Sequence, residues 1–142
     1  MRSKYPVAVH IFFLREKQIL LLRRFNTGYE DGSYSVVAGH VDAGETATQA
    51  AIREAKEEVD VILEPTDIQI VHVMHRKSED ERIDFFMAVR HWGGDVTNNE
   101  PQKCDDLSWT DIDSLPQNTI PYVKRAIEEY QAGFFYSEFG WQ

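Results

Sequence analysis

The first part of the chain carries its hydrophobic residues in short, nearly continuous runs. Two such runs, Ala8–Leu14 and Gln18–Leu22, are separated by the polar stretch 15–17. Runs of this length are typical of buried strands, and the polar stretch between them predicts a hairpin. The segment Phe25–Ser33 contains Asn, Gly and Asp residues that favour a loop, and a brief strand is predicted at Tyr34–Ala38.

The pattern then changes to a helical period. Small or apolar residues recur every four positions, at Ala47, Ala51, Ala55 and Val59. This spacing predicts a helix with a narrow apolar seam, and its small side chains allow the helix to lie close to a sheet. Thr46 and Gln49 match a capping box at the start of the helix, and we expect the helix to end near Asp60.

The second half of the chain mixes both periods. Apolar runs predict three strands and one further helix, at Ile68–Met74, Ile83–Val89, Leu107–Trp109 and Ile120–Tyr130. The charged stretch His75–Arg82 is expected to be a hairpin loop, and Gly93–Asp106 a polar loop. The aromatic tail Phe134–Trp141 favours core or dimer packing over a base-stacking platform. The chain contains no repeat and no linker, so we expect one α/β or α+β layered domain over residues 1–142.

Composition narrows the possible partners. A formal net charge of −9 argues against a nucleic acid polymer, because no basic stripe is available to neutralise phosphates. A small phosphorylated ligand remains compatible, since a bound metal can supply positive charge. Cys104 is the only cysteine, so no internal disulfide is possible and a cytoplasmic location is expected. The N-terminal apolar run is too short to span a bilayer, and no signal peptide or membrane association is expected.

Three acidic residues on the first helix stand out from this background. Glu54, Glu57 and Glu58 are three and four positions apart, so a helix places all three carboxylates on one face. Like charges at this spacing repel, and the cluster needs a counter-charge. A hard divalent cation held by oxygen ligands would supply one.

The surrounding residues extend the cluster into a longer motif. The pattern G-x5-E-x7-R-E-x-x-E-E is met at Gly39, Glu45, Arg53, Glu54, Glu57 and Glu58. This pattern, within residues 39–61, resembles the Nudix box of the Nudix hydrolases. The resemblance extends to the order of elements over most of the chain. It implies a Nudix fold, in which a mixed β-sheet is sandwiched between α-helices.

The resemblance also implies roles for the box residues. Glu54 and Glu58 would be the chief metal ligands, and Glu57 would share a metal or activate water. The backbone carbonyl of Ala38 would be a further ligand, and Arg53 would orient a carboxylate. The cofactor implied is Mg²⁺, with Mn²⁺ as an alternative. Glu45 would brace the loop or contact the metal through water, and Asp60 stands where the box normally has glycine.

Residues outside the box are expected to complete the site. Glu100 resembles the family's acid in the loop before the last strand. It would bind a second metal or act as a base, with Glu79, Asp80, Glu81, Asp105 and Asp106 as alternatives. Arg24 resembles the arginine that contacts phosphate in MutT-like members, although Arg23 points to the opposite face of the strand. Asn118 is a candidate for contact with a base edge, and His40 is a candidate for contact with substrate.

The function implied is Mg²⁺-dependent hydrolysis of a nucleoside diphosphate linked to another group. A MutT-like nucleoside triphosphate pyrophosphatase, which releases a nucleoside monophosphate and pyrophosphate, is the first choice because the chain is little longer than the bare fold. An ADP-ribose or nucleotide-sugar pyrophosphatase is one alternative. A non-catalytic nucleotide-binding module is another, although every box acid is present. The expected partner is a small nucleotide, and the protein is expected to be a monomer or a homodimer.

Overall fold

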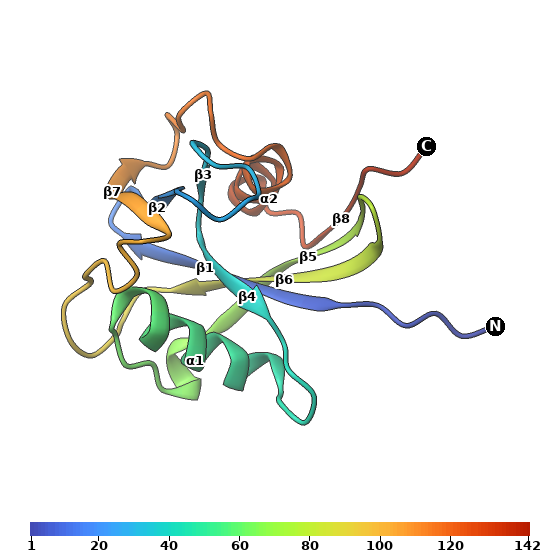
Figure 1. Ribbon diagram of the computed structural model, residues 1–142, viewed down its shortest axis with the longest axis horizontal. Helices are drawn as coiled ribbons and strands as arrows, with labels where there is room; N and C mark the ends of the chain where they lie inside the picture. The colour runs from blue at the N-terminus through green and yellow to red at the C-terminus, as the bar shows by residue number, and fades with distance from the viewer.

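A computed structural model describes all residues from Met1 to Gln142 as one mixed sheet with a helix on each side (Figure 1). The strands are β1 (Val7–Arg15), β2 (Gln18–Arg24), β3 (Tyr34–Ser35), β4 (Val37–His40), β5 (Gln69–Lys77), β6 (Glu81–Val89), β7 (Cys104–Asp111) and β8 (Tyr136–Phe139). The helices are α1 (Ala47–Val59) and α2 (Pro121–Ala132), with a short 3₁₀ turn at Pro65–Asp67.

Strand β1 is the centre of the sheet. The strand order is β3-β2-β1-β6-β5-β8, with β4 paired to β1 and β7 paired to β2. The first part of β1 lies between β6, which is parallel, and β4, which is antiparallel. Its last residues, Leu14 and Arg15, pair instead with β2. Strand β1 therefore changes neighbours along its length, from β4 to β2. The chain leaves β4 beside β1 and continues into α1.

The two faces of the sheet bury separate cores. Along β1, Val9, Ile11 and Phe13 pack in the core beneath α1. The alternate residues Phe12 and Leu14 pack in the core beneath α2. This alternation is the period of a strand covered on both sides. The prediction of a mixed sheet between helices is therefore confirmed. Because β1 is covered on both faces, its apolar residues form a nearly continuous run.

Helix α1 begins and ends as its local sequence predicts. Thr46 Oγ1 accepts a hydrogen bond from the Gln49 amide, and the Gln49 side chain accepts one from the Thr46 amide, which completes the capping box. Asp60 closes the helix in the left-handed conformation with a φ of 56°. Lys56 donates to the Asp60 carboxylate at 2.6 Å. The buried Ala51 and Ala55 allow the helix to pack closely on β1 and β4.

Several predicted boundaries were wrong. The expected loop His75–Arg82 is shorter, because β5 continues to Lys77 and β6 begins at Glu81. Charged residues occur within these strands because cross-strand pairing satisfies them, as it does for Arg76. The expected strand Tyr34–Ala38 is divided into β3 and β4, which pair with different strands. Strand β7 spans Cys104–Asp111 rather than three residues, because it pairs with β2 along nearly all of its length.

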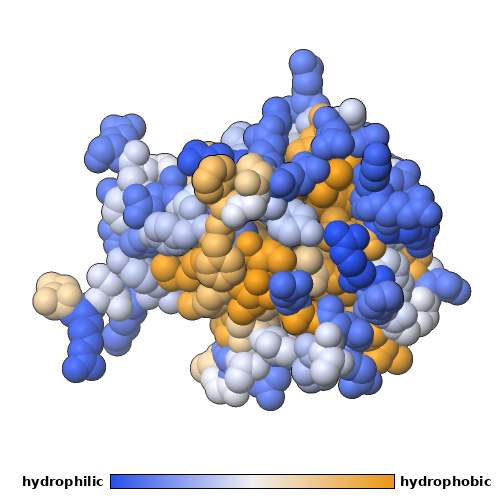
Figure 2. All heavy atoms as spheres, turned by 180° about the vertical axis from the view of Figure 1, so that it is seen from behind, coloured by the Kyte–Doolittle hydropathy of each residue, from blue (hydrophilic) through white to orange (hydrophobic).

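The C-terminal tail forms a strand that the sequence did not indicate. Strand β8 lies parallel to β5 at the edge of the sheet, and its neighbours include exposed aromatic residues. The exposed large apolar residues here are Phe134, Phe135, Tyr136 and Trp141. The face opposite to the view of Figure 1 also shows apolar atoms gathered between charged side chains (Figure 2). Neither helix has the length or the apolar character that crossing a membrane requires.

A polar cluster is buried between the sheet and α2. Asp84 on β6 is fully buried, and its carboxylate lies 3.0 Å from His10 Nε2 on β1. Arg76 on β5 donates to the same carboxylate from Nε at 2.7 Å and from Nη2 at 3.2 Å. Three neighbouring strands, β1, β6 and β5, therefore each contribute one member of the cluster.

Acidification is expected to weaken the fold through Asp84. Burial acts to raise the pKa of this carboxyl, but His10 and Arg76 outweigh it and hold the pKa at about 2, below the ordinary 3.8. Because the folded-state pKa is depressed, the stabilisation is complete above the ordinary pKa and is lost as the pH falls through the folded-state pKa. The expected loss is roughly 2 kcal/mol in the free energy of unfolding.

Urea unfolding of the wild type and Asp84→Asn between about pH 6 and about pH 2 measures this contribution. The difference in stability between the two proteins should shrink at the acid end of the range. Asp80→Asn is the matched control, since Asp80 is exposed and pairs only with Arg82. A difference between wild type and Asp84→Asn that stays constant across the range would contradict the assignment.

Candidate active site

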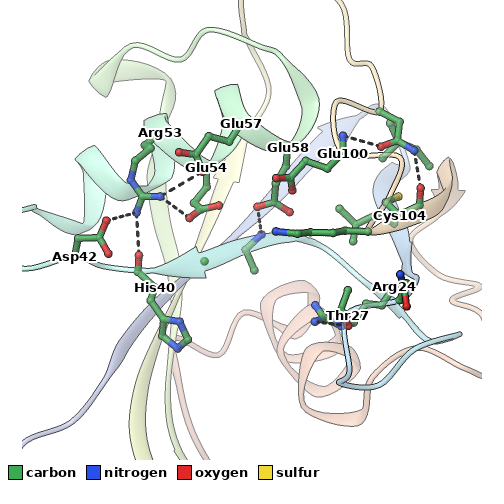
Figure 3. A pocket seen from close by; sticks show the side chains of 17 residues that line it. Arg24, Thr27, His40, Asp42, Arg53, Glu54, Glu57, Glu58, Glu100 and Cys104 are labelled. Carbon is green, nitrogen blue, oxygen red and sulfur yellow. Dashed lines mark hydrogen bonds and ion pairs between the residues drawn. The ribbon is translucent and has the colours of Figure 1, made fainter.

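The acidic face of α1 borders an open cavity beside the end of β4 (Figure 3). The cavity has a volume of about 580 Å³. Its lining includes all three predicted box glutamates, Glu54, Glu57 and Glu58, together with Ala38 and Gly39 of β4. Helical spacing places the carboxylates on one face, and β4 places the backbone of the box loop against them. The structure therefore brings together the residues that the motif singled out.

Arg53 joins the loop before α1 to the helix itself. Its Nε and Nη2 donate to the two carboxylate oxygens of Glu45, each at 2.9 Å. Its Nη1 donates to Glu54 at 2.7 Å, and Nη2 also donates to the His40 carbonyl at 3.0 Å. The hydrogen bond from Arg53, with a further one from the Asp42 amide, lowers the pKa of Glu45 to about 2. Arg53 thus holds the Glu45 carboxylate with two hydrogen bonds and the Glu54 carboxylate with one.

Glu58 is an acid of the cavity that is largely removed from water. One of its oxygens accepts a hydrogen bond from the Ala38 amide at 3.2 Å. Burial raises the pKa of Glu58 well above its ordinary value, and the adjoining carboxylates of Glu54 and then Glu100 raise it further. Figure 3 shows the Glu58 and Glu100 side chains next to each other in the cavity. Burial and the neighbouring acids therefore both disfavour the ionised form of Glu58.

These residues fit a divalent cation in the character of their donor atoms. Several carboxylate oxygens that are close together and partly removed from water are the hard ligands that Mg²⁺ and Mn²⁺ prefer. At Gly39, an added Cβ would overlap the Glu54 carboxylate, so the backbone forms a cradle that only glycine leaves open. In the present conformation, no group of three or more His, Cys, Asp or Glu side chains is arranged to hold a metal ion. Binding of a cation would therefore require the carboxylates to turn away from their present partners.

Glu100 reaches the cavity because its loop is tied to the end of α1. The Thr97 amide donates to the Val59 carbonyl, and the Asn99 amide donates to the Glu58 carbonyl, both at 3.0 Å. The Asn99 side chain adds a hydrogen bond to the Glu57 carbonyl at 3.1 Å. These contacts join segments about forty residues apart in sequence. They place the predicted fourth acid beside Glu58.

The alternative acids lie elsewhere. Asp105 accepts from Arg23 at 2.7 Å, and Asp106 accepts a short hydrogen bond from the Tyr34 hydroxyl. Neither Glu81 nor these two aspartates line the cavity, whereas Glu79 and Asp80 line a neighbouring one. Of the candidates named from sequence, only Glu100 lies among the box acids.

Two cations without a carboxylate partner, Arg24 and Lys103, line the same cavity as the acids. Arg24 ends β2, and its Nε and Nη2 donate to the neutral acceptors Tyr29 O, at 2.6 Å, and Thr27 Oγ1, at 3.1 Å. Lys103 also lines the cavity and comes from the loop that carries Glu100. Sequence reasoning identified Arg24 and missed Lys103, which could have been found only by knowing where this loop lies. Both cations remain available to an anionic ligand.

Asn118 lies outside this cavity. Its side-chain amide donates to the Gly32 carbonyl at 2.8 Å and so holds the loop before β3. It does not cap α2, because the residue at the helix N-cap is Ile120. The contact of Asn118 with a base edge stays a prediction. His40, in contrast, lines the cavity, and its contact with substrate stays a prediction.

A second cavity, which the sequence did not indicate, adjoins the first. It has a volume of about 540 Å³ and lies toward α2. The two cavities share Arg24, Ala38, Gly39 and His40, so the backbone of β4 forms the boundary between them. The remainder of its lining includes His10, Arg76 and Tyr122 from the α2 side of the sheet.

The chain has clear relatives among known proteins. The NAD-capped RNA hydrolase NudC of Pectobacterium atrosepticum is 31% identical over 126 residues, which cover 84% of this chain and 45% of that protein. The ADP-ribose pyrophosphatase of Methanocaldococcus jannaschii is 28% identical, over 87% of this chain and 72% of that one. The 8-oxo-dGTP diphosphatase of Escherichia coli is 25% identical, over 87% and 96%. The chain thus spans about half the length of NudC.

The fold is shared with a solved structure as well. The crystal structure of a MutT NUDIX hydrolase from Burkholderia pseudomallei superposes with a TM-score of 0.80 at 24% identity, and the match covers 89% of this chain and 98% of that one. The sequence model of the NUDIX domain family matches residues 4–130 of this chain. These residues include α1, β4 and the loop with Glu100. The chain therefore belongs to the NUDIX domain family, a family of hydrolases.

Proposed function

We propose that this protein hydrolyses the diphosphate linkage of a nucleoside triphosphate and releases a nucleoside monophosphate and pyrophosphate. The observation that carries the proposal is the meeting of four acids, Glu54, Glu57, Glu58 and Glu100, with the cations Arg24 and Lys103 in one cavity. An acid cluster beside free cations suits a ligand that is itself anionic and arrives with a divalent metal.

The protein's own residues have distinct parts in this reaction. Glu54, Glu57 and Glu58, with the carbonyl of Ala38, would hold Mg²⁺ or Mn²⁺, and Glu100 would add a ligand or accept a proton from water. When bound, the metal supplies positive charge to the diphosphate oxygens and favours deprotonation of the attacking water. Arg53 keeps the Glu54 carboxylate in place through the contacts described above.

Arg24 and Lys103 would bind the phosphates directly. An arginine can donate to two phosphate oxygens at once, whereas a lysine acts as a point charge. Neither residue is neutralised by a carboxylate in the protein, so their charge is available to the substrate. Because these cations line the same cavity as the acids, a diphosphate bound to them would lie next to the metal ligands.

The choice of a nucleoside triphosphate rests on the extent of the matches. The 8-oxo-dGTP diphosphatase is matched over nearly its whole length, at 96%, whereas the ADP-ribose pyrophosphatase is matched over 72% of its length. Because these identities are low and close to each other, a pyrophosphatase acting on ADP-ribose is the second candidate. The NAD-capped RNA hydrolase is matched over 45% of its length and gives less support.

A hydrolysis assay over a panel of nucleotides tests the proposal directly. The panel contains the common ribo- and deoxyribonucleoside triphosphates, ADP-ribose and NAD, with products resolved by chromatography. We expect a nucleoside triphosphate to have the highest kcat/KM and to give monophosphate and pyrophosphate, with activity dependent on Mg²⁺ and lost in EDTA. Higher kcat/KM with ADP-ribose would replace the first candidate by the second, and hydrolysis that persists in EDTA would refute both.

Loss of a box carboxylate is expected to abolish turnover while the fold survives. Glu54→Gln or Glu58→Gln should lower kcat by at least about a hundredfold, because the amide is a weaker metal ligand. Thermal unfolding should remain close to wild type, since neither carboxylate is needed by the core. Glu64→Gln, at an exposed glutamate remote from the cavity, is the matched control. Near-full Mg²⁺-dependent activity in either variant would contradict the assigned metal site.

Gly39→Ala tests the cradle beneath Glu54. The added methyl group must displace the Glu54 carboxylate, and a misplacement of this size is expected to lower kcat/KM by roughly a hundredfold. Gly93→Ala is the control, because a Cβ there meets only Ile62 at 3.6 Å. Equal activity in the two variants would show that the position of Glu54 is not critical.

A further inference from the structure

The loop that follows β2 holds both the backbone and the side chain of Arg24. At the far end of the loop, the Arg24 amide donates to the Ser33 carbonyl at 2.9 Å, and the Gly32 amide donates to the Arg24 carbonyl at 2.8 Å. Nearer the start of the loop, Tyr29 O and Thr27 Oγ1 accept hydrogen bonds from the Arg24 guanidinium. Figure 3 shows the Arg24 and Thr27 side chains next to each other.

The backbone of this loop is unusually bent. Asn26 and Glu30 have φ angles of 55° and 51°, and Gly28 and Gly32 are also left-handed, with φ angles of 85° and 86°. Left-handed backbone is unfavourable in residues other than glycine, and it persists where other contacts over-determine the path of the chain. The loop therefore depends on a contact that holds it closed.

The carboxylate of Asp31 makes that contact. Its oxygens accept from the Thr27 amide at 3.0 and 3.2 Å, from the Gly28 amide at 2.9 Å and from the Thr27 hydroxyl at 2.6 Å. These hydrogen bonds, that of the hydroxyl first, lower the pKa of Asp31 below its ordinary value. The carboxylate is therefore ionised near neutral pH and only accepts. Asp31 reaches Arg24 through Thr27, because the two charged side chains share no hydrogen bond.

The proton of the Thr27 hydroxyl decides how Arg24 is held. Both the Asp31 carboxylate, at 2.6 Å, and the Tyr29 carbonyl, at 3.0 Å, lie within reach of this proton. The shorter bond to an ionised group is the stronger one, so the proton points to Asp31. The two lone pairs of the hydroxyl then accept from Arg24 Nη2 at 3.1 Å and from the Tyr29 amide at 3.2 Å.

Without the charge of Asp31 this arrangement would change. The Thr27 proton would turn to the Tyr29 carbonyl, which already accepts from Arg24 Nε at 2.6 Å. The hydroxyl would then compete with Arg24 for one acceptor and turn a lone pair away from Nη2. Asp31 therefore keeps two neutral acceptors in place for the guanidinium.

The orientation of Arg24 matters because Arg24 lines both cavities. Its partners in the loop are neutral, and its Nη1 makes no hydrogen bond within the protein. An arginine side chain loses rotamer freedom when it binds a ligand, so an orientation that is fixed in advance favours binding.

We propose that Asp31 is a positioning residue for the diphosphate of the substrate. Acting through the Thr27 hydroxyl, it fixes Arg24 in the orientation in which Nη1 donates to a phosphate oxygen, and Asp31 itself touches no substrate. The inference rests on the proposed function, because it deepens the part given there to Arg24. A purely structural role for Asp31 would affect the protein whatever residue stands at position 24, and this difference can be measured.

A double-mutant cycle in kcat/KM tests whether Asp31 acts through Arg24. Asp31→Asn and Thr27→Val should each lower kcat/KM for the preferred nucleotide about tenfold, the effect of one lost charge-assisted hydrogen bond. In an Arg24→Ala background the same substitutions should change kcat/KM by less than about twofold, because residues that act as a unit are not additive. Glu30→Gln, at an exposed acid of the same loop, is the matched control and should resemble the wild type.

A binding measurement separates the positioning role from the proposed function. The probe is methylenediphosphonate, a diphosphate analogue that resists hydrolysis, and its affinity is measured by calorimetry with Mg²⁺ present. Asp31→Asn should bind the probe about tenfold more weakly than the wild type, and the difference should vanish in the Arg24→Ala background. This pattern in a protein that hydrolyses no nucleotide would refute the proposed function and leave the positioning role standing.

Three results would overturn the positioning role. They are equal losses from Asp31→Asn in both backgrounds, wild-type activity and affinity in Asp31→Asn, and a wild type that does not bind the probe. Nucleotide hydrolysis by the wild type would leave the proposed function intact in each case. Thr27→Val keeps the test decisive if Asp31→Asn does not fold, since it removes the hydroxyl and retains the carboxylate.

Discussion

The site depends above all on Arg53, which resolves a conflict of charge on α1. Three glutamates on one helical face repel one another, and Glu58 is held beside Glu54 away from water. One planar guanidinium binds Glu45 with two hydrogen bonds, Glu54 with a third and the His40 carbonyl with a fourth. The same residue therefore anchors the loop that follows β4 and orients an acid of the helix. The remaining negative charge is left for a cation to neutralise.

Strand β4 lies at the boundary between the two cavities. Its backbone at Ala38 and Gly39 lines both cavities, with the box acids on the α1 side and the cluster around Asp84 on the α2 side. This division follows from β1, whose alternate residues face the two helices and whose neighbour changes from β4 to β2.

Each cavity has a buried acidic residue near it, and burial of a carboxylate costs free energy. Glu58 and Asp84 are acidic residues removed from water, and their environments shift their pKa values in opposite directions. Asp84 is matched by Arg76 and His10, so its charge is stable in the free protein. Glu58 is buried beside the carboxylates of Glu54 and Glu100, and both burial and these neighbours raise its pKa. The charge of Asp84 is therefore matched within the protein, whereas Glu58 lies among other acids.

The sequence by itself determined the features that depend on local spacing. The capping box of α1, the shared face of its glutamates, the hairpin of β1 and β2, and the box pattern all follow from short-range periodicity. Only the tertiary structure selected Glu100 from the candidate acids and added Lys103 to the cavity. It alone also decided that β8 pairs with β5, that Asn118 lies outside the cavity, and that Arg76, Asp84 and His10 meet. These contacts join segments far apart in the chain. Backbone hydrogen bonds and strand register set them, and neither has a local signature in the sequence.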